Sequence, residues 1–227
     1  MNKRNRKRSE RSIFSSAAIT GMGVVSPFGV GISPFYRALH DMDCRICRSM
    51  SFPELKAPLL ISEIRSFNLA HALKARSLSQ KKIMELELYL AKDLLSTHAA
   101  VLAVIEAYQQ AKLNAESVDF NKVGVIISGG NLSQLQQWRQ FHKHTTRPLC
   151  FASPSWALRF LDSHLLSVIS ALFKFKGPGI TTSAASASGH AALMQGLQWI
   201  QLGIVDLCFV VGAMAELSAV EWQSLIN

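Results

Sequence analysis

The stretch Lys176-Gly-Pro-Gly-Ile-Thr-Thr-Ser-Ala-Ala-Ser-Ala-Ser-Gly-His190 decides the fold. A short β-type run over residues 180–183 follows a Gly-Pro-Gly turn and passes at once into a small-residue-rich helix, predicted over residues 185–202. Such a strand-to-helix turn places one side chain at the positive end of a helix dipole. Small neighbours such as Ala187 and Gly189 would let a substrate reach backbone N–H groups that could hold an oxyanion. A tightly packed junction without chemistry is the alternative that these residues leave open.

Strands and helices alternate on both sides of this turn. Apolar runs that close in glycine predict buried strands over residues 123–128 and 205–211, and a further short strand is predicted over 17–26. Helical spacing predicts helices over 35–40, 87–112 and 132–142, and one that starts at Ser153 or Asp162; residues 44–67 read as irregular. This alternation predicts an α/β fold, a mostly parallel mixed sheet layered with helices. We expect a basic flexible tail over 1–16 and a single domain over 17–227.

The composition fits a globular protein with a core. Hydrophobic residues make up 49% of the 227 residues and charged residues 17%, which excludes a disordered polymer. No apolar run approaches the ~18 residues of a membrane span. The net charge is +9, but the first twelve residues hold six basic residues and one acidic residue, which leaves +4 for the rest. No aromatic residues interleave with these charges, so a solvated tail is expected and nucleic acid is not the expected partner.

The cysteines and histidines do not form a pattern typical of a metal site. Cys44 and Cys47 have zinc spacing, but no second Cys or His pair lies at a helpful distance. His142 and His144 read as a polar surface run. Four cysteines in a chain of this size do not predict a disulfide framework, so we expect a reducing, cytoplasmic location, no metal and no cofactor.

Several short motifs resemble those of one family, and they occur in its order. The segment Ala18-Ile-Thr-Gly-Met-Gly-Val-Val-Ser-Pro27 is similar to the opening of the β-ketoacyl synthases. Asp162, Lys176-Gly-Pro178, the Ser-Ala-Ser-Gly run and Gly203-x-x-Asp-x-x-x-x-x-Gly212 are similar to that family's later signposts. Each motif is weak alone, but together they cover the chain from Ala17 to about Ser218. The resemblance implies the N-terminal half of a thiolase-like fold.

Two departures from the family then bear on function. The position of the family's nucleophilic cysteine is Ser186, and a hydroxyl is a far poorer nucleophile than a thiolate without a dedicated base. The resemblance places the two catalytic histidines in a second half, and none of the seven histidines here matches their motifs. His190 reads as a packed or polar helix residue. The chain is therefore not expected to catalyse condensation unaided.

The resemblance implies a permanent partner. A lone half of this fold would expose a broad apolar face, beyond what monomers usually leave in water. In type II polyketide systems a ketosynthase pairs with a related subunit, the chain length factor, through the strand before the elbow. Here that strand is Ile180, Thr181, Thr182 and Ser183. We therefore predict a non-catalytic chain length factor, most similar to those of aryl-polyene clusters, which pairs with a full-length ketosynthase and meets acyl carrier protein through that complex.

In this role the chain would shape the tunnel for the partner's growing acyl chain. Its candidate wall residues are Leu132, Leu135, Trp138 and Phe141, although each one could simply pack in the core. A decarboxylase that acts on malonyl carrier protein with serine in place of cysteine is the alternative enzyme function, because decarboxylation needs no covalent acyl-enzyme. A nucleic-acid-associated protein and a truncated remnant without a role are two further hypotheses.

Overall fold

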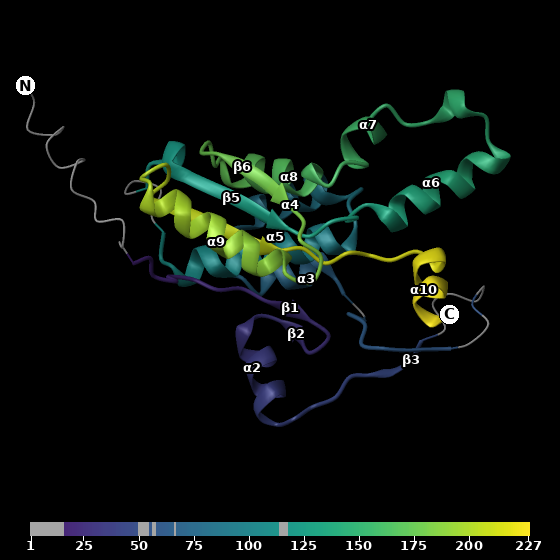
Figure 1. Cartoon of the computed structure of the whole chain (residues 1–227), viewed down its shortest axis with the longest axis horizontal. Coiled ribbons are helices and arrows are strands. Elements are labelled where there is room, and N and C mark those ends of the chain that lie inside the picture. The colour runs from purple at the N-terminus through teal and green to yellow at the C-terminus, as the bar shows by residue number, and fades with distance from the viewer. Residues whose placement is uncertain (1–15, 50–54, 56–57, 66, 114–117) are drawn as a thin grey trace, which may run out of the picture.

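Three parallel strands form the centre of the molecule. The computed structural model describes residues 16–49, 55, 58–65, 67–113 and 118–227. Its main sheet has the order β6-β5-β7, with β5 (Val123–Ser128), β6 (Gly179–Thr182) and β7 (Leu207–Gly212) (Figure 1). In the register of this sheet, β5 residue Ile126 lies between Ile180 and Val210. The predicted α/β class with a parallel sheet is confirmed.

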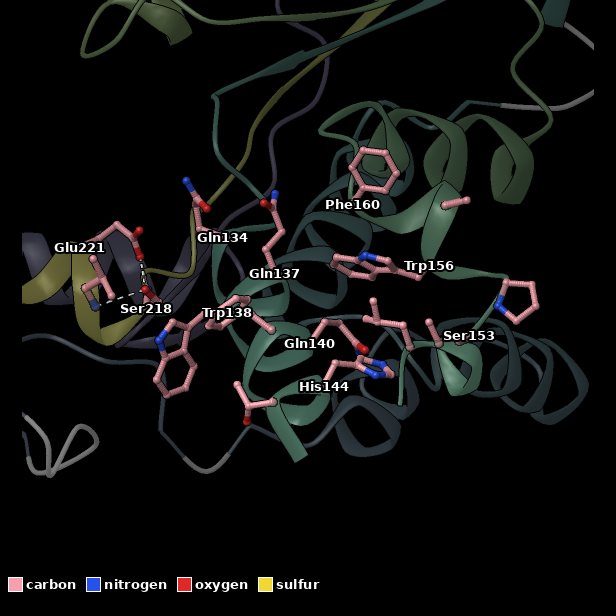
Figure 2. Close-up of a pocket in the computed structure, with 17 residues that line it drawn as sticks. Gln134, Gln137, Trp138, Gln140, His144, Ser153, Trp156, Phe160, Ser218 and Glu221 are labelled. Atoms are coloured by element: carbon pink, nitrogen blue, oxygen red, sulfur yellow. Dashed lines mark hydrogen bonds between the residues drawn. The ribbon is translucent and has the colours of Figure 1, made fainter. Parts of the chain in front are cut away.

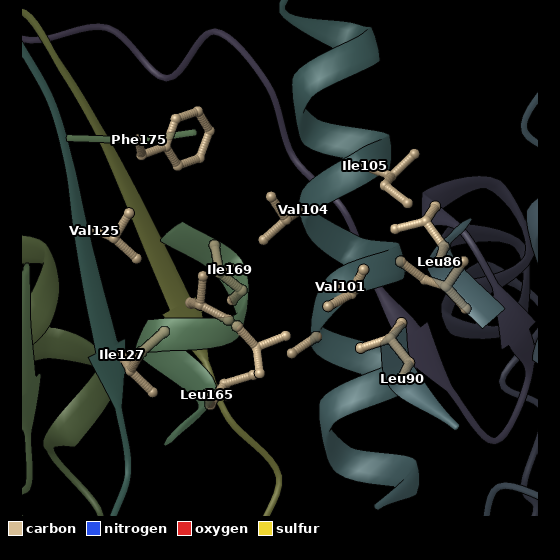
Figure 3. Close-up of a cluster of buried hydrophobic side chains, with 14 of the residues drawn as sticks. Leu86, Leu90, Val101, Val104, Ile105, Val125, Ile127, Leu165, Ile169 and Phe175 are labelled. Atoms are coloured by element: carbon tan, nitrogen blue, oxygen red, sulfur yellow. The ribbon is translucent and has the colours of Figure 1, made fainter. Parts of the chain in front are cut away.

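Helices cover both faces of this sheet. All six residues of β5 are buried. Because strand side chains alternate, Val125 and Ile127 join the core cluster that includes α5 (Leu95–Gln110) and α8 (Ser163–Phe173) (Figure 3). Ile126 belongs to a second cluster with Ala192 and Trp199 of α9 (Ser188–Gln201). The sheet is therefore a middle layer, and the turn that enters α9 lies at the end of β6.

The predicted opening strand is wrong for most of its length. Only β1 (Val25–Ser26) pairs, in a small hairpin with β2 (Gly29–Val30). Residues 16–24 form no strand, because part of their backbone bonds to α5 instead. Met22 N–H donates to Gln110 Oε1 at 2.6 Å, and Val24 N–H donates to Glu106 Oε2 at 3.1 Å.

The helix predicted over 87–112 is two helices. α4 (Gln80–Leu90) ends before α5 begins at Leu95. Two distant groups lie at the break: the Asp93 carboxylate bonds His164 Nε2 at 2.8 Å, and Glu216 Oε1 accepts the N–H of Ser96 at 2.6 Å. Both partners lie far along the chain. The local spacing of apolar residues, which continues across the break, therefore could not indicate it.

The remaining elements lie around this body. Residues 44–67, expected to be irregular, contain an antiparallel pair of short strands, β3 (Cys47–Ser49) and β4 (Leu59–Ile61). Residues 50–54, 56–57 and 66 fall outside the described part. Residues 1–15 of the predicted tail also lie outside it. The arm formed by α6 and α7 extends from one end of the sheet (Figure 1). The other bounds are α2 (Ile32–His40), α3 (Leu69–Lys74), α6 (Gln134–Thr146), α7 (Trp156–Arg159) and α10 (Ala219–Ile226), with single 3-10 turns at Phe120–Lys122 and Leu149–Phe151.

Candidate active site and acyl-chain surface

The chain turns sharply between β6 and α9, and this elbow (residues 183–188) carries Ser186. Ala185 has a φ of 47°, a left-handed conformation that costs a non-glycine residue about 1–2 kcal/mol. The Ala187 N–H donates to the Ala184 carbonyl at 3.0 Å and closes the turn. Ser186 is exposed at this point. The strand and the helix together therefore present the Ser186 hydroxyl to the outside.

The elbow is held by Ser188, a residue that the sequence reasoning did not single out. Its side chain is buried, and its Oγ accepts the N–H of Ala184 at 2.8 Å. The same hydroxyl donates to the carbonyl of Ala185 at 2.7 Å. A serine that begins a predicted helix is the one signal that could have found it, since such residues commonly bond nearby backbone groups.

Ser186 itself has no activating group in the described part of the chain. No hydrogen bond or ion pair joins its hydroxyl to a described histidine or carboxylate, and His190 is exposed. The Ala187 cap position of α9 makes no side-chain capping bond; the Ser188 N–H donates to the Ala185 carbonyl at 3.1 Å, which leaves the N–H groups of Gly189 and His190 without a cap. This arrangement favours holding a developing negative charge rather than generating a strong nucleophile.

The loop after β5 adjoins the elbow. A Cβ on Gly130 would lie 2.7 Å from Ser183 Oγ, so the two segments approach closely at this point. Asn131 has a φ of 59°, and the Asp162 carboxylate holds this loop by accepting the N–H groups of Asn131 and Leu132 at 2.9 and 2.7 Å. Asp162, which the sequence indicates as a motif residue and a possible helix start, thus fixes the path of the chain from β5 into α6.

A cavity of about 1120 Å³ lies between α6, the segment leading through α7, and α10 (Figure 2). Of the four predicted tunnel residues, Trp138 and Phe141 line it. Leu132 and Leu135 are buried and do not line it. Only Trp138 and Phe141 are therefore placed where they could contact a molecule in this cavity.

The cavity wall is mostly apolar, with one unusual polar group. Trp156, Phe160 and Leu149 face the same space as Trp138. His144 also lines it; its Nδ1 lies 3.1 Å from the carbonyl of Arg147, whereas its buried Nε2 has no partner among the described residues. Such a wall suits an elongated apolar molecule that carries an occasional polar atom.

The predicted partner strand is a sheet edge. Among the described residues β6 pairs with β5 alone, and Ile180, Thr181 and Thr182 are half-buried. Thr181 Oγ1 is buried without a partner among the described residues. On the neighbouring helix α9, Leu193 and Met194 are 54% and 58% exposed, as expected for a helix face that lacks its covering layer.

The described residues include no group of three or more side chains suited to a metal ion. No described helix has the length and apolarity of a membrane span. Cys44 and Cys150 are exposed, whereas burial of Cys208 on β7 raises the pKa of its thiol to about 12. Cys208 is therefore protonated at neutral pH and is not a thiolate nucleophile.

The fold and the elbow together define the class of this protein. The family model of the β-ketoacyl synthase N-terminal domain matches residues 15–227. The chain belongs to the β-ketoacyl synthase family, and the predicted resemblance is confirmed.

Two relatives show how far the likeness extends. The chain is 28% identical over 211 residues to the polyketide biosynthesis malonyl-ACP decarboxylase PksF of Bacillus subtilis, which covers 91% of this chain and 46% of PksF. It is 25% identical over 213 residues to the mitochondrial 3-oxoacyl-[acyl-carrier-protein] synthase of Arabidopsis thaliana, covering 88% of this chain and 45% of that protein. The chain thus spans about half the length of these relatives.

Solved structures have the same fold. The ishigamide ketosynthase/chain length factor superposes with a TM-score of 0.63 at 18% identity, covering 92% of this chain and 55% of that one. A type II polyketide synthase acyl carrier protein in complex with its ketosynthase, AntDE:AntF, gives a TM-score of 0.63 at 16% identity, covering 92% and 52%. At these identities the likeness shows the fold alone.

Proposed function

We propose that this chain is the elbow-bearing half of a ketosynthase-like decarboxylase that converts malonyl-acyl carrier protein to acetyl-acyl carrier protein. The observation that carries this proposal is Ser186, an exposed hydroxyl on a strained elbow where the family has its thiol. The 28% identity to PksF over 91% of the chain supports it further. The sequence predicts a non-catalytic chain length factor, with this decarboxylase as the alternative, and the likeness to PksF is the reason that we prefer the alternative.

The reaction needs charge stabilisation rather than a nucleophile. The bond between the α-carbon and the carboxylate of the malonyl group breaks, carbon dioxide leaves, and the electron pair becomes an enolate on the thioester oxygen. A proton then returns to the α-carbon to give the acetyl group. In this chain the uncapped N-terminus of α9 would hold the enolate oxygen, next to the Ser186 hydroxyl. Without a thiol at the elbow, no acyl group transfers to it and condensation does not follow.

The chain would carry out this reaction only together with the second half of the family fold. The family resemblance assigns two histidines to that half, and no described residue here takes their place. The exposed β6 edge and the exposed residues of α9 are the surfaces where a ketosynthase-type partner would pack. We therefore propose a permanent complex with such a partner, which acyl carrier protein visits with its malonyl cargo.

The experiment is an intact-mass measurement on malonyl-acyl carrier protein. The chain is co-expressed with its ketosynthase partner, and the carrier protein is followed for loss of carbon dioxide. Ser188→Ala, which removes the two side-chain hydrogen bonds across the elbow, should slow decarboxylation about tenfold or more. Ser167→Ala, an exposed serine on α8, is the matched control and should not change the rate. Carrier protein that keeps its full malonyl mass in the presence of the wild-type complex would refute the proposal.

A chain length factor is the second candidate, and the cavity of about 1120 Å³ favours it. Its mostly apolar wall suits a growing acyl chain. If this function holds, Trp138→Ala and Phe141→Ala should lengthen the product of the partner ketosynthase, because each enlarges the cavity. Leu135→Val, a change outside the cavity, is the control. Unchanged product length in both cavity variants, read by mass spectrometry, would contradict a tunnel at this place.

A further inference from the structure

The β5–α6 loop lies between the elbow and the base of the arm formed by α6 and α7. Its residue Gly129 donates its N–H to the carbonyl of Thr182, the last residue of β6, at 3.0 Å. The next residue, Gly130, approaches Ser183 so closely that an added Cβ would lie 2.7 Å from Ser183 Oγ. Because Ser183 is the first residue of the elbow, the position of this loop bears on the strand end that leads to Ser186.

Asp162 holds this loop with both of its carboxylate oxygens. Oδ2 accepts the N–H of Asn131 at 2.9 Å, and Oδ1 accepts the N–H of Leu132 at 2.7 Å. Hydrogen bonds to an ionised carboxylate are stronger than those between neutral groups. They hold Asn131 at a φ of 59°, a left-handed conformation that non-glycine residues adopt uncommonly. The conformation of the loop therefore depends on a residue that lies 30 positions beyond Leu132.

The Asp162 carboxylate does not serve its own helix. Asp162 occupies the cap position of α8, where an aspartate commonly accepts an N–H from the first helical turn. Here the side chain makes no capping bond, and the backbone of Asp162 is itself helical, with a φ of −60° and a ψ of −24°. The carboxylate is thus committed to the β5–α6 loop, which favours a role beside the elbow over a role in starting α8.

Closure of the arm is the alternative role for these two bonds. Leu132 precedes α6 and Asp162 follows α7, so the carboxylate also joins the two ends of the arm. Ser133 closes the same base, because its Oγ donates to the carbonyl of Phe160 at 2.6 Å. The Ser133 hydroxyl otherwise accepts a bond from Gln137 within α6. A comparison of Asp162 with Ser133 therefore separates placement of the elbow from closure of the arm.

We propose that Asp162 is a positioning residue for the proposed decarboxylation. By fixing the β5–α6 loop against Ser183, it keeps Ser186 and the N-terminus of α9 in the orientation that meets the enolate oxygen. It acts through this loop and does not touch the reacting atoms. Groups that stabilise a developing charge must be held in place in advance, so a small displacement of the elbow lowers the rate. The chemistry in this inference rests on the proposed function, but the placement of the elbow can be measured without it.

The first test follows decarboxylation of malonyl-acyl carrier protein by the partner complex. Asp162→Asn leaves one acceptor oxygen for two N–H groups, so kcat should fall about tenfold while KM stays within about twofold. Ser133→Ala is the matched control and should keep kcat within about twofold of the wild type. Asp162→Glu, which moves the carboxylate by one carbon, should lower kcat in the same direction and serves if Asp162→Asn does not fold, as judged by circular dichroism. A folded Asp162 variant with the kcat of the control shows that the proposal is wrong.

The second test reads the elbow without carrier protein. Ser186→Cys places a thiol near the N-terminus of α9, where the helix favours the reactive thiolate. Its alkylation by iodoacetamide is followed on the full chain at submicromolar concentration, by mass spectrometry of the peptide that contains residue 186. Adding Asp162→Asn should slow alkylation about threefold or more, whereas adding Ser133→Ala should not. If the wild-type complex leaves malonyl cargo intact, the proposed function fails and this rate alone decides the role of Asp162. Equal rates in the two double variants overturn it.

Discussion

The opening segment lies on α5 because two of its residues lack a side chain. A Cβ on Gly23 would lie 1.9 Å from the carbonyl oxygen of Ala103, and one on Gly21 would lie 2.1 Å from that of Ala107. Both contacts are with backbone, which cannot move aside as the end of a flexible side chain can. The close approach brings Val24 within reach of Glu106.

Gly23→Ala should therefore destabilise the protein by about 2 kcal/mol or more, because the segment must leave α5. The control is Gly189→Ala in the first turn of α9, where an added Cβ meets nothing within 4 Å. That change should leave stability equal or raise it by up to about 1 kcal/mol. Urea unfolding followed by circular dichroism compares the two, and equal midpoints would contradict the close packing.

Among the elements, α10 depends on a capping box. Ser218 Oγ bonds the Glu221 carboxylate, and Glu221 Oε2 accepts the Ser218 N–H at 2.8 Å. The Ser218 hydroxyl is the main reason that the pKa of Glu221 lies below its usual value. Because the pKa is lowered in the folded state, this contribution is present above the usual carboxyl pKa of 4.5 and is lost as the pH falls through the folded value.

Ser218→Ala should cost about 1 kcal/mol at pH 7, and the difference from wild type should shrink as the pH falls below 4.5. Ser224→Ala, which removes a hydroxyl bonded to the Val220 carbonyl in the same helix, should have little effect at either pH. Thermal unfolding at the two pH values makes the comparison. A Ser218→Ala deficit that grows in acid would contradict the capping role.

Elements with strong local patterns could be predicted from the sequence, and those decided by distant partners could not. β5 and β7 follow from apolar runs that end in glycine, and α9 follows from the elbow motif. The end of α4 could not be predicted, since the groups at the break, Glu216 and His164, lie far along the chain. The path of residues 16–24 could not be predicted for the same reason, because side chains of α5 bond this backbone in place of a strand partner.

In the candidate site, too, local motifs could be predicted from the sequence, and positions that depend on the three-dimensional fold could not. Ser186 could be placed on the elbow because its position is fixed by a local motif. Helical spacing put Leu135, Trp138 and Phe141 on roughly one side of a helix, but spacing does not tell where the core ends. α6 extends beyond the sheet, so Leu135 is buried while Phe141 is 71% exposed and lines the cavity. Ser188 was missed because its role depends on the three-dimensional turn.

The whole molecule exposes apolar surface beside an open sheet edge. Leu193, Met194 and Leu197 share one side of α9, and they are 54%, 58% and 39% exposed. Such surfaces associate in water. We predict that the isolated chain self-associates above micromolar concentration, and that the double variant Leu193→Gln, Met194→Gln does so less. Light scattering after size exclusion measures this; an isolated wild-type chain that remains monomeric would contradict it. The exposed Leu39→Gln on α2 is the control.

The absence of a thiol at the elbow is what separates decarboxylation from condensation in this account. The most direct measurement is the intact mass of this chain itself, taken from the partner complex after incubation with malonyl-acyl carrier protein. The account predicts that the wild-type chain keeps its own mass while the carrier protein loses carbon dioxide, and that Ser186→Cys gains a covalent acyl group. An acyl group attached to Ser186 in the wild-type chain would contradict the account.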